Sequence, residues 1–334
     1  MSEVLFKTNN SFSPTETPPG TKMICRQQIT TLIDGQEIGF STLVVRGQAE
    51  GKTLVVCGGI HGDEYESIVA IQECFRELDA TAMSGTFIGV PIVNEPAFYA
   101  HRRESPVDNK NLARVFPGQS DGTVSEQIAY YLTHAVLKHA SLLVDLHSAG
   151  TYYTLKPWVG YTMKSGRLQQ VQREAAIAFG LDLIWGSPFL PGRTSSGSYL
   201  YEVPTLYVEM QGSGLCRRED VGRLKQGIHH LLCYLGILRG TYPRTPPPYL
   251  RESQEGEEGH LQISHLSEHR GLFLPDVTLW TRVREGQQLG AVYSPEGKVV
   301  QRVLAEQSGR IVVLRTCPSV APGDFLATII PLST

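Results

Sequence analysis

Two histidines and one glutamate at the ends of apolar segments are the residues of this chain best suited to chemistry. His61 and Glu64 lie three positions apart in the glycine-rich segment 58–64, which follows an apolar run. His147 ends a second apolar run. Two imidazoles and one carboxylate make a three-ligand set for zinc that leaves a fourth position for water. The pattern predicts a hydrolytic site with one Zn²⁺ per chain, although other divalent ions can occupy such a set.

Two further carboxylates occupy similar positions. Asp145 precedes His147 by two residues, so on a strand both side chains face one side, and Asp145 could orient the imidazole. Its alternative is a solvated acid at a strand end. Glu209 follows the apolar segment 206–208 and precedes Gly212. Beside zinc, Glu209 could take a proton from the bound water. Its alternative is a glutamate that pairs with an arginine.

A basic, turn-rich segment over residues 101–114 follows the turn that begins at Asn94. Arg103 and Arg114 in this segment could hold a carboxylate through paired hydrogen bonds or stabilise the oxyanion of a tetrahedral intermediate. A solvated loop is the alternative interpretation.

Other motifs are set aside. Residues 118–122 match Gly-x-Ser-x-Gly, but they follow Phe116-Pro117 and not the strand that a nucleophile elbow requires. The remaining histidines are interpreted as surface residues (His265 and His269) or as packing or solvent-facing residues of helices (His134, His229 and His230).

Strand and helix patterns alternate in the segments that must position these residues. Strands are expected over Met23–Leu32, Ile38–Val45, Thr53–Cys57, Phe87–Val93, Leu142–His147 and Thr205–Met210. Helices are expected from near Tyr65 to Leu78 and over Thr123–His139, Arg167–Phe179 and Val221–Leu238. Asp34-Gly35 predicts a hairpin. The alternation predicts an α/β fold with a mainly parallel sheet and helices on both faces, and ligands bind at the carboxyl edge of such sheets.

The composition divides the chain into segments. Residues 1–20, rich in Ser, Thr, Pro and Asn, are expected to form a loose leader before a catalytic domain over 21–245. Three prolines and an acidic stretch predict a linker over 246–259. Short strand patterns punctuated by glycines then predict a small all-β domain over 260–334.

The overall composition is that of an ordinary globular protein, with 41% hydrophobic and 19% charged residues in a chain of 334. A net charge of −3 without a long basic run argues against nucleic acid as a partner. No run approaches the ~18 apolar residues of a membrane span, and no signal peptide is evident. Six scattered cysteines fit free thiols in a reducing compartment. We expect a cytoplasmic protein, and homo-oligomerisation is left open.

Over residues 22–334 the chain resembles the succinylglutamate desuccinylase/aspartoacylase family, which is related to the zinc carboxypeptidases. The resemblance rests on Gly-Gly-Ile-His-Gly-Asp-Glu (58–64), Asn94 with Pro96, Asn-Leu-Ala-Arg-Val-Phe-Pro-Gly (111–118), Asp-Leu-His-Ser (145–148) and Val-Glu-Met-Gln-Gly (208–212). It implies a zinc-carboxypeptidase-like mixed sheet with helices on both faces and a C-terminal barrel-sandwich domain of the biotinyl/lipoyl-like kind. The tail has no Met-Lys-Met acceptor, so neither modification is expected.

The resemblance also implies roles for individual residues. His61, Glu64 and His147 would bind zinc, and Glu209 would act as general base and then as general acid. Arg103 would polarise the scissile carbonyl. Substrate would be bound by Arg114, Asn111 and Asn94.

One departure concerns Ala113, where the family usually has asparagine. Loss of that amide can cost ~1–3 kcal/mol of binding or change the preferred substrate, so aspartoacylase-like specificity is not expected. The leading hypothesis is a zinc amidohydrolase that removes an acyl group from an N-acyl amino acid or a similar small amine. The alternatives are a carboxypeptidase that acts on peptide C-termini and a binding protein without catalysis. Retention of Glu209 argues against the binding protein, because a binder needs no base.

Overall fold

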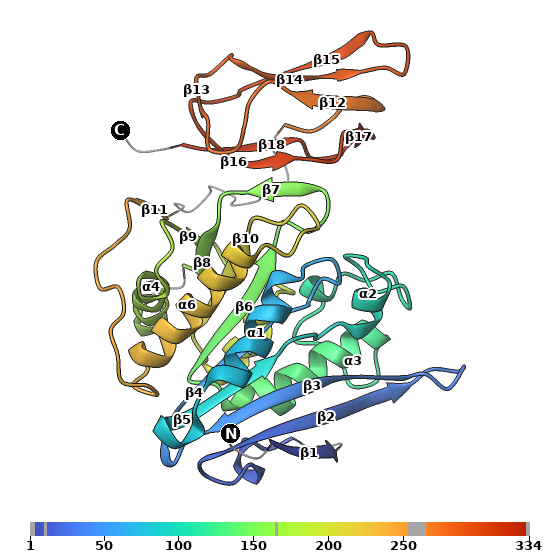
Figure 1. Ribbon diagram of the computed structural model, residues 1–334. Coiled ribbons are helices and arrows are strands. Elements are labelled where there is room, and N and C mark those ends of the chain that lie inside the picture. Colours follow the sequence, from blue (N-terminus) through green and yellow to red (C-terminus); the bar gives the residue numbers. More distant parts are fainter. Residues whose placement is uncertain (1–3, 10–11, 164–165, 253–264, 332–334) are drawn as a thin grey trace.

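The computed structural model describes residues 4–9, 12–163, 166–252 and 265–331. Within these ranges, ten strands form one mixed sheet in the order β1-β2-β3-β5-β4-β6-β10-β8-β9-β11 (Figure 1). The strands are β1 (Val4–Asn9), β2 (Thr21–Thr31), β3 (Glu37–Arg46), β4 (Ala49–Cys57), β5 (Ser84–Val90), β6 (Leu142–Ser148), β8 (Trp158–Thr162), β9 (Leu183–Ser187), β10 (Thr205–Met210) and β11 (Tyr249–Glu252). The short β7 (Tyr153–Leu155) lies outside this sheet.

Helices cover both faces of the sheet, as the sequence pattern predicts. The α-helices are α1 (Glu66–Glu77), α2 (Glu95–Tyr99), α3 (Val124–Tyr131), α4 (Arg167–Phe179), α5 (Thr194–Ser198) and α6 (Arg218–Tyr234). Shorter helical turns are η1 (Pro14–Glu16), η2 (Ala80–Ala82), η3 (Leu112–Arg114), η4 (Leu132–Val136), η5 (Leu137–His139) and η6 (Tyr199–Tyr201).

Alternate side chains of β4 pack into two hydrophobic cores, one on each face of the sheet. Leu54 and Val56 belong to the hydrophobic core that α1, α4 and α6 complete. Val55 and Cys57 belong to the core on the other face, which α3 completes. Successive strand residues point to opposite faces, so a wholly apolar strand is what a sheet covered on both sides requires.

Most of the expected elements are present. The hairpin at Asp34-Gly35 joins the antiparallel strands β2 and β3. Helix α4 has the predicted bounds and ends at Gly180, whose φ of 94° is left-handed. The helix predicted over Thr123–His139 is instead divided into α3, the π-helical turn η4 and η5.

Two expectations about the segments that flank the central α/β part differ from the structure. In the part of the leader that is described, β1 pairs in parallel with β2, and Phe12 is buried. In the expected linker, β11 pairs in parallel with β9 and so extends the sheet. Polar and proline-rich composition does not prevent an edge strand, because a strand at the edge needs only one hydrogen-bonded neighbour.

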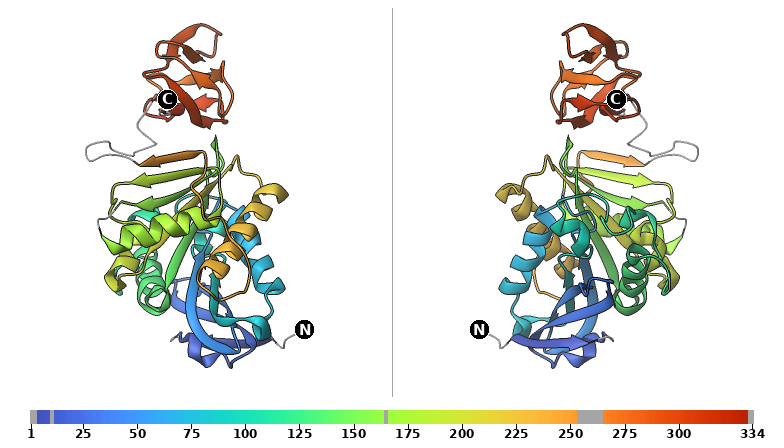
Figure 2. Two further views of the ribbon diagram at one scale, coloured as in Figure 1. Left: turned by 90° about the vertical axis from the view of Figure 1, so that its left-hand side faces the viewer. Right: turned by 90° about the vertical axis from the view of Figure 1, so that its right-hand side faces the viewer.

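The C-terminal region is a small β domain without a helix in its described part, residues 265–331, as predicted. Its strands are β12 (Gly271–Pro275), β13 (Arg282–Val283), β14 (Gln288–Tyr293), β15 (Val299–Leu304), β16 (Gly309–Arg315), β17 (Ser319–Val320) and β18 (Ala327–Ile330). They form two small sheets around a core of their own. Figure 2 shows this domain at one end of the molecule and the N-terminal strands at the other.

The β domain is joined to the α/β part by backbone pairing and by a shared core. Strand β7 pairs antiparallel with β16. One hydrophobic cluster combines Trp158 and Trp185 with Val312 and Phe325. The two parts therefore pack as one structure at the edge where the sheet strands end.

The cysteines and the lengths of the helices complete the description of the fold. All six cysteines lie in the described part of the chain and are free thiols. Within the described ranges, the chain contains no helix of the length and apolar character that a membrane crossing requires.

Candidate metal centre and active site

His61, Glu64 and His147 converge at the carboxyl ends of β4 and β6. One ligand atom from each residue can be chosen so that all lie within 4.8 Å of one another. The Nδ1 atoms of His61 and His147 are 3.3 Å apart, and they lie 2.7 and 3.0 Å from the two carboxylate oxygens of Glu64. All three side chains are buried. The group can hold a divalent metal ion.

Glycines allow this turn to form directly after β4. Gly59 has a φ of +58°, a backbone conformation that favours glycine. A Cβ on Gly62 would lie 2.0 Å from the backbone carbon of Ala97, so no side chain fits there. The turn therefore presses against the segment that carries α2, and it places His61 and Glu64 on the same side.

The outer nitrogens of both imidazoles have partners. The Nε2 of His147 lies 2.9 Å from Asp145 Oδ2, which also accepts a hydrogen bond from Thr194 Oγ1 at 2.7 Å. The Nε2 of His61 lies 3.1 Å from Asn111 Oδ1. Such contacts fix ring orientation and tautomer, so that the Nδ1 atoms face the common centre.

The electrostatics of the centre favour an ionised carboxylate among imidazoles. Burial opposes ionisation of Glu64, but the neighbouring charges of His61 and His147 outweigh it and hold the pKa of Glu64 well below its usual range. Burial also opposes protonation of His147, but Asp145 and Glu64 raise the pKa of His147 well above its usual value. The carboxylates on both sides of His147 thus favour positive charge at the centre, which a bound metal ion would supply.

Glu209 reaches the centre from the adjacent strand. Parallel pairing of β10 with β6 sets Glu209 beside His147 and Tyr207 beside Asp145. Burial raises the pKa of the Glu209 carboxyl to about 7, against the lowering effect of the His147 charge. A carboxyl group with a pKa near neutrality can both accept and return a proton.

Three arginines line the same cavity, two from the segment 101–114 and one from the residue before α5. Arg103 donates from Nη1 to Glu64 Oε1 at 3.1 Å. Arg114 donates to the carbonyl of Ala113 at 2.9 Å, and burial together with the charges of Arg193 and Arg103 lowers the pKa of Arg114 to about 10. Arg193 lies over the ring of Tyr207, 5.9 Å from its centroid. Like charges gathered in this way are suited to an anionic ligand.

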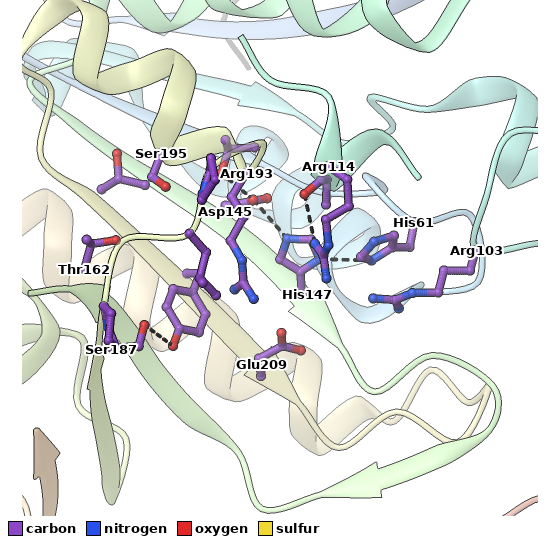
Figure 3. A pocket seen from close by; sticks show the side chains of 17 residues that line it. His61, Arg103, Arg114, Asp145, His147, Thr162, Ser187, Arg193, Ser195 and Glu209 are labelled. Atoms are coloured by element: carbon purple, nitrogen blue, oxygen red, sulfur yellow. Dashed lines mark hydrogen bonds and ion pairs between the residues drawn. The ribbon is translucent and has the colours of Figure 1, made fainter. Parts of the chain in front are cut away.

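The cavity has a volume of about 480 Å³ and is mixed in character (Figure 3). Its lining includes His61, His147 and Glu209 at one end. Hydroxyl groups and apolar side chains form much of the rest: Thr162, Ser187, Ser195, Thr205, Leu190 and Pro191. The lining suits a small polar molecule with at least one negative charge.

Two residues that were expected to bind substrate are engaged elsewhere. Asn94 is fully buried, caps α2 by accepting from the Ala97 N–H, and donates to the Ile60 carbonyl. Asn111 accepts a hydrogen bond from the Ala113 N–H at 2.9 Å and contacts His61. Its amide therefore orients the His61 ring from the side that faces away from the centre. Ala113 does line the cavity, beside Arg114.

Arg193 and Thr194 were not found by sequence reasoning. Arg193 directly precedes α5 and Thr194 is its first residue, in a part of the chain without a metal or strand pattern. Only the packing of this part beside β6 and β10 brings the two residues to the site. A basic residue followed by a short hydroxyl-rich stretch was the one available sign.

The motifs that were set aside lie away from the site. Residues 118–122 form a loop before α3, with no strand leading into it. His134 contacts the hydroxyl of Tyr201, and His229 and His230 lie on α6. The interpretation of His265 as a surface residue is wrong, because it is buried in the β domain and its Nδ1 lies 3.0 Å from the Ala327 carbonyl.

Comparison with known proteins gives a consistent result. Residues 50–235 match the family model of the succinylglutamate desuccinylase/aspartoacylase catalytic domain. The N-alpha-acetyl-L-2,4-diaminobutyric acid deacetylase of Halomonas elongata is 32% identical over 293 residues, which is 86% of this chain and 84% of the relative.

Solved structures share the fold over nearly the whole chain. A succinylglutamate desuccinylase from Silicibacter sp. TM1040 has a TM-score of 0.83 and 29% identity, covering 91% of this chain and 92% of that one. The product-bound ectoine utilization protein EutE (DoeB) from Ruegeria pomeroyi has a TM-score of 0.83 and 27% identity, with 91% and 93% covered.

Proposed function

Because the chain belongs to the succinylglutamate desuccinylase/aspartoacylase family, we propose that it is a metal-dependent amidohydrolase acting on N-acyl amino acids or related small amines. The observation that carries the proposal is the convergence on one cavity of the His61-Glu64-His147 group, Glu209 and three arginines. Its reaction would add water across the amide, giving a carboxylic acid and a free amine.

We infer zinc as the metal from the chemistry of the donor set. Two imidazoles and one carboxylate, oriented by Asp145 and Asn111, match the ligands that catalytic zinc prefers. When bound, the ion would supply Lewis acidity toward water and the scissile carbonyl.

Glu209 would carry the proton. Its carboxylate would accept a proton from the attacking water and then return it to the departing amine nitrogen. Its position beside His147 and a pKa of about 7 support both transfers.

The arginines would divide two tasks. Arg103, held at Glu64, would donate a hydrogen bond to the carbonyl oxygen as negative charge develops there. Arg114 and Arg193 would hold the substrate carboxylate, and Arg193 would supply contacts in place of the amide that Ala113 lacks. A cavity of about 480 Å³ favours small acyl amino acids over long peptides, and the diaminobutyrate deacetylase suggests acetylated amino acids as the first substrates.

The test is release of free amine from N-acetyl amino acids by the zinc-loaded protein, with and without a chelator. We expect turnover that the chelator abolishes and that Glu209→Gln lowers by about 10²–10⁴-fold. Glu202→Gln changes an exposed glutamate before the same strand and is the matched control.

The zinc content and melting temperature of each variant should be measured as well. They distinguish a loss of catalytic activity from a loss of metal binding or folding. Near-full activity of Glu209→Gln would show that another group is the base. A folded, zinc-loaded protein that cleaves no acyl amino acid would overturn the proposal and favour a cleft that only binds.

A further inference from the structure

A second cavity, of about 650 Å³, meets the first one at the catalytic centre. Both cavities are lined by Arg103 and Glu209, so the reacting atoms lie where the two join. The far wall of the second cavity comes from the C-terminal β domain, through Val313, Gly323, Asp324 and Phe325. A substrate held at the centre therefore has two directions in which to extend.

The wall from the β domain is held firmly in place. Buried Arg315 donates from Nη2 to Asp324 Oδ2 at 3.1 Å and from Nη1 to the Tyr153 hydroxyl at 3.2 Å. The ring of Phe325 packs on Tyr153 with centroids 5.2 Å apart. Because Tyr153 lies on β7, which pairs with β16, the two walls of the cavity are connected through backbone hydrogen bonds.

The two cavities differ in charge. In the described part of the chain, four acids line the second cavity, and two arginines, Arg102 and Arg103, accompany them. The acids are Asp63, Glu104, Glu209 and Asp324. The first cavity has the opposite balance, with three arginines against Asp145 and Glu209. Arg103 pairs with Glu64, and Asp324 pairs with Arg315, so each offers the second cavity only part of its charge. Asp63 and Glu104 keep the balance of the second cavity on the acidic side.

Asp63 adds a fixed negative charge to the second cavity. Its Oδ2 accepts hydrogen bonds from the backbone N–H and the hydroxyl of Thr151, at 2.9 and 3.0 Å. Its Oδ1 has no hydrogen-bond partner among the described residues, although the residue is only 6% exposed. A carboxylate held in this way disfavours a second anion nearby.

These charges orient an N-acyl amino acid. An Nα-acyl amino acid carries its carboxylate on the carbon that bears the scissile nitrogen, and this group matches Arg114 and Arg193 of the first cavity. The acyl group then extends into the second cavity. There it meets acids, which attract an ammonium group, and the aromatic rings of Tyr152, Tyr153 and Phe325, which accept an apolar chain. The guanidinium of Arg315 already lies 5.7 Å from the ring centroids of Tyr152 and Tyr153, so the attraction for an ammonium group comes from the acids.

We propose that the second cavity is the acyl subsite and that it selects neutral or ammonium-bearing acyl groups over dicarboxylic ones. The inference rests on the proposed deacylase function and narrows it. The chain would be a poor desuccinylase despite the name of its family, because the free carboxylate of a succinyl group would lie among Asp63, Glu104 and Asp324.

The test uses acyl groups of equal length on one amino acid, the one best released from its acetyl derivative. N-butyryl, N-succinyl and N-(4-aminobutyryl) derivatives have four-carbon acyl chains that differ in terminal charge. We expect kcat/KM for the succinyl compound to be at least about tenfold below that for the butyryl compound. We expect kcat/KM for the aminobutyryl compound to equal or exceed that for the butyryl compound.

Substitution of acids in the second cavity tests whether they cause the preference for butyryl over succinyl groups. Asp324→Asn is expected to reduce the butyryl-to-succinyl ratio by about tenfold, through kcat/KM for the succinyl compound. Glu104→Gln, on the opposite wall, should reduce the ratio in the same direction and serves if Asp324→Asn fails to fold. Asp276→Asn removes an exposed acid of the same β domain outside the cavity and should leave the ratio unchanged.

The outcomes separate the two proposals. Succinyl hydrolysis as fast as butyryl hydrolysis would overturn the acyl preference while leaving the deacylase function intact. A ratio that neither variant changes would overturn its assignment to the second cavity. Failure to cleave any compound, the acetyl derivative included, would overturn the proposed function itself.

Discussion

At the scale of single residues, the site is a chain of contacts that leads outward from the proposed ligands. His147 lies between Glu64 on its inner side and Asp145 on its outer side. Thr194 then donates to Asp145, and both are buried. Since each group fixes the next, the orientation of the imidazole depends on a hydroxyl that contacts no ligand of the centre directly.

This dependence can be measured with Thr194→Val, which removes the hydroxyl and keeps the shape. We expect zinc affinity to fall by about 10-fold or more, as outer partners of metal ligands typically contribute. Competition with a chelator gives the affinity. Thr133→Val is the matched control, because its buried hydroxyl has no hydrogen-bond partner among the described residues. Equal zinc affinity in both variants would show that Asp145 holds His147 without help.

At the scale of elements, the site depends on the turn between β4 and α1. Glu64 lies two residues before α1, so the position of that helix sets the position of a ligand. Lys22 on β2 holds the other end of α1. Its Nζ donates to the carbonyls of Phe75 and Arg76 at 2.7 and 2.9 Å, and the side chain is buried. A cation at the helix C-terminus also interacts favourably with the helix dipole.

Lys22→Met should therefore destabilise the protein, because the two carbonyls lose their donor inside the structure. The expected cost is ~1–3 kcal/mol in the free energy of unfolding, measured by urea titration of the metal-free protein. Lys52→Met replaces an exposed lysine of β4 and should change stability by less than about 0.5 kcal/mol. Equal stability of the two variants would mean that water satisfies the helix end equally well.

At the scale of the whole molecule, the β domain and the α/β part share a core. Trp158 and Trp185 of the α/β part pack with Val312 and Phe325 of the β domain, and Trp280 contacts Tyr249 of β11. The three tryptophans of the chain thus surround the junction. Loss of that junction would expose apolar surface on both sides and open the second cavity.

The shared core predicts one cooperative unfolding transition. Tryptophan fluorescence, which reports the junction, and far-UV circular dichroism, which reports the large sheet and its helices, should coincide across a urea titration. Val312→Ala, at a fully buried position, should shift both curves together to lower urea. A fluorescence transition at lower urea than the circular dichroism would show instead that the β domain undocks by itself.

Much of the fold follows from the sequence because its signals are local. Apolar strands that alternate with amphipathic helices predict a covered sheet, and Gly180 predicts the end of α4. The unpredicted strands have a different cause. Strand β1 is only six residues long and lies in a leader rich in Ser, Thr and Pro, and β11 follows the prolines that end at Pro248. Each is made by pairing with a neighbour distant in the sequence.

The sequence by itself determined the proposed reactive set, because local strand patterns mark its positions. His61 and Glu64 follow β4, and His147 and Glu209 lie near the ends of β6 and β10. Tertiary structure decided what surrounds that set. Asn94 hydrogen-bonds the Ile60 carbonyl, and Asn111 contacts His61. Arg193, from the loop before α5, lines the first cavity, and Asp324, from the β domain, lines the second. A strand's end is encoded locally, whereas a cavity wall is assembled from segments far apart in the chain, and only packing determines which of them meet.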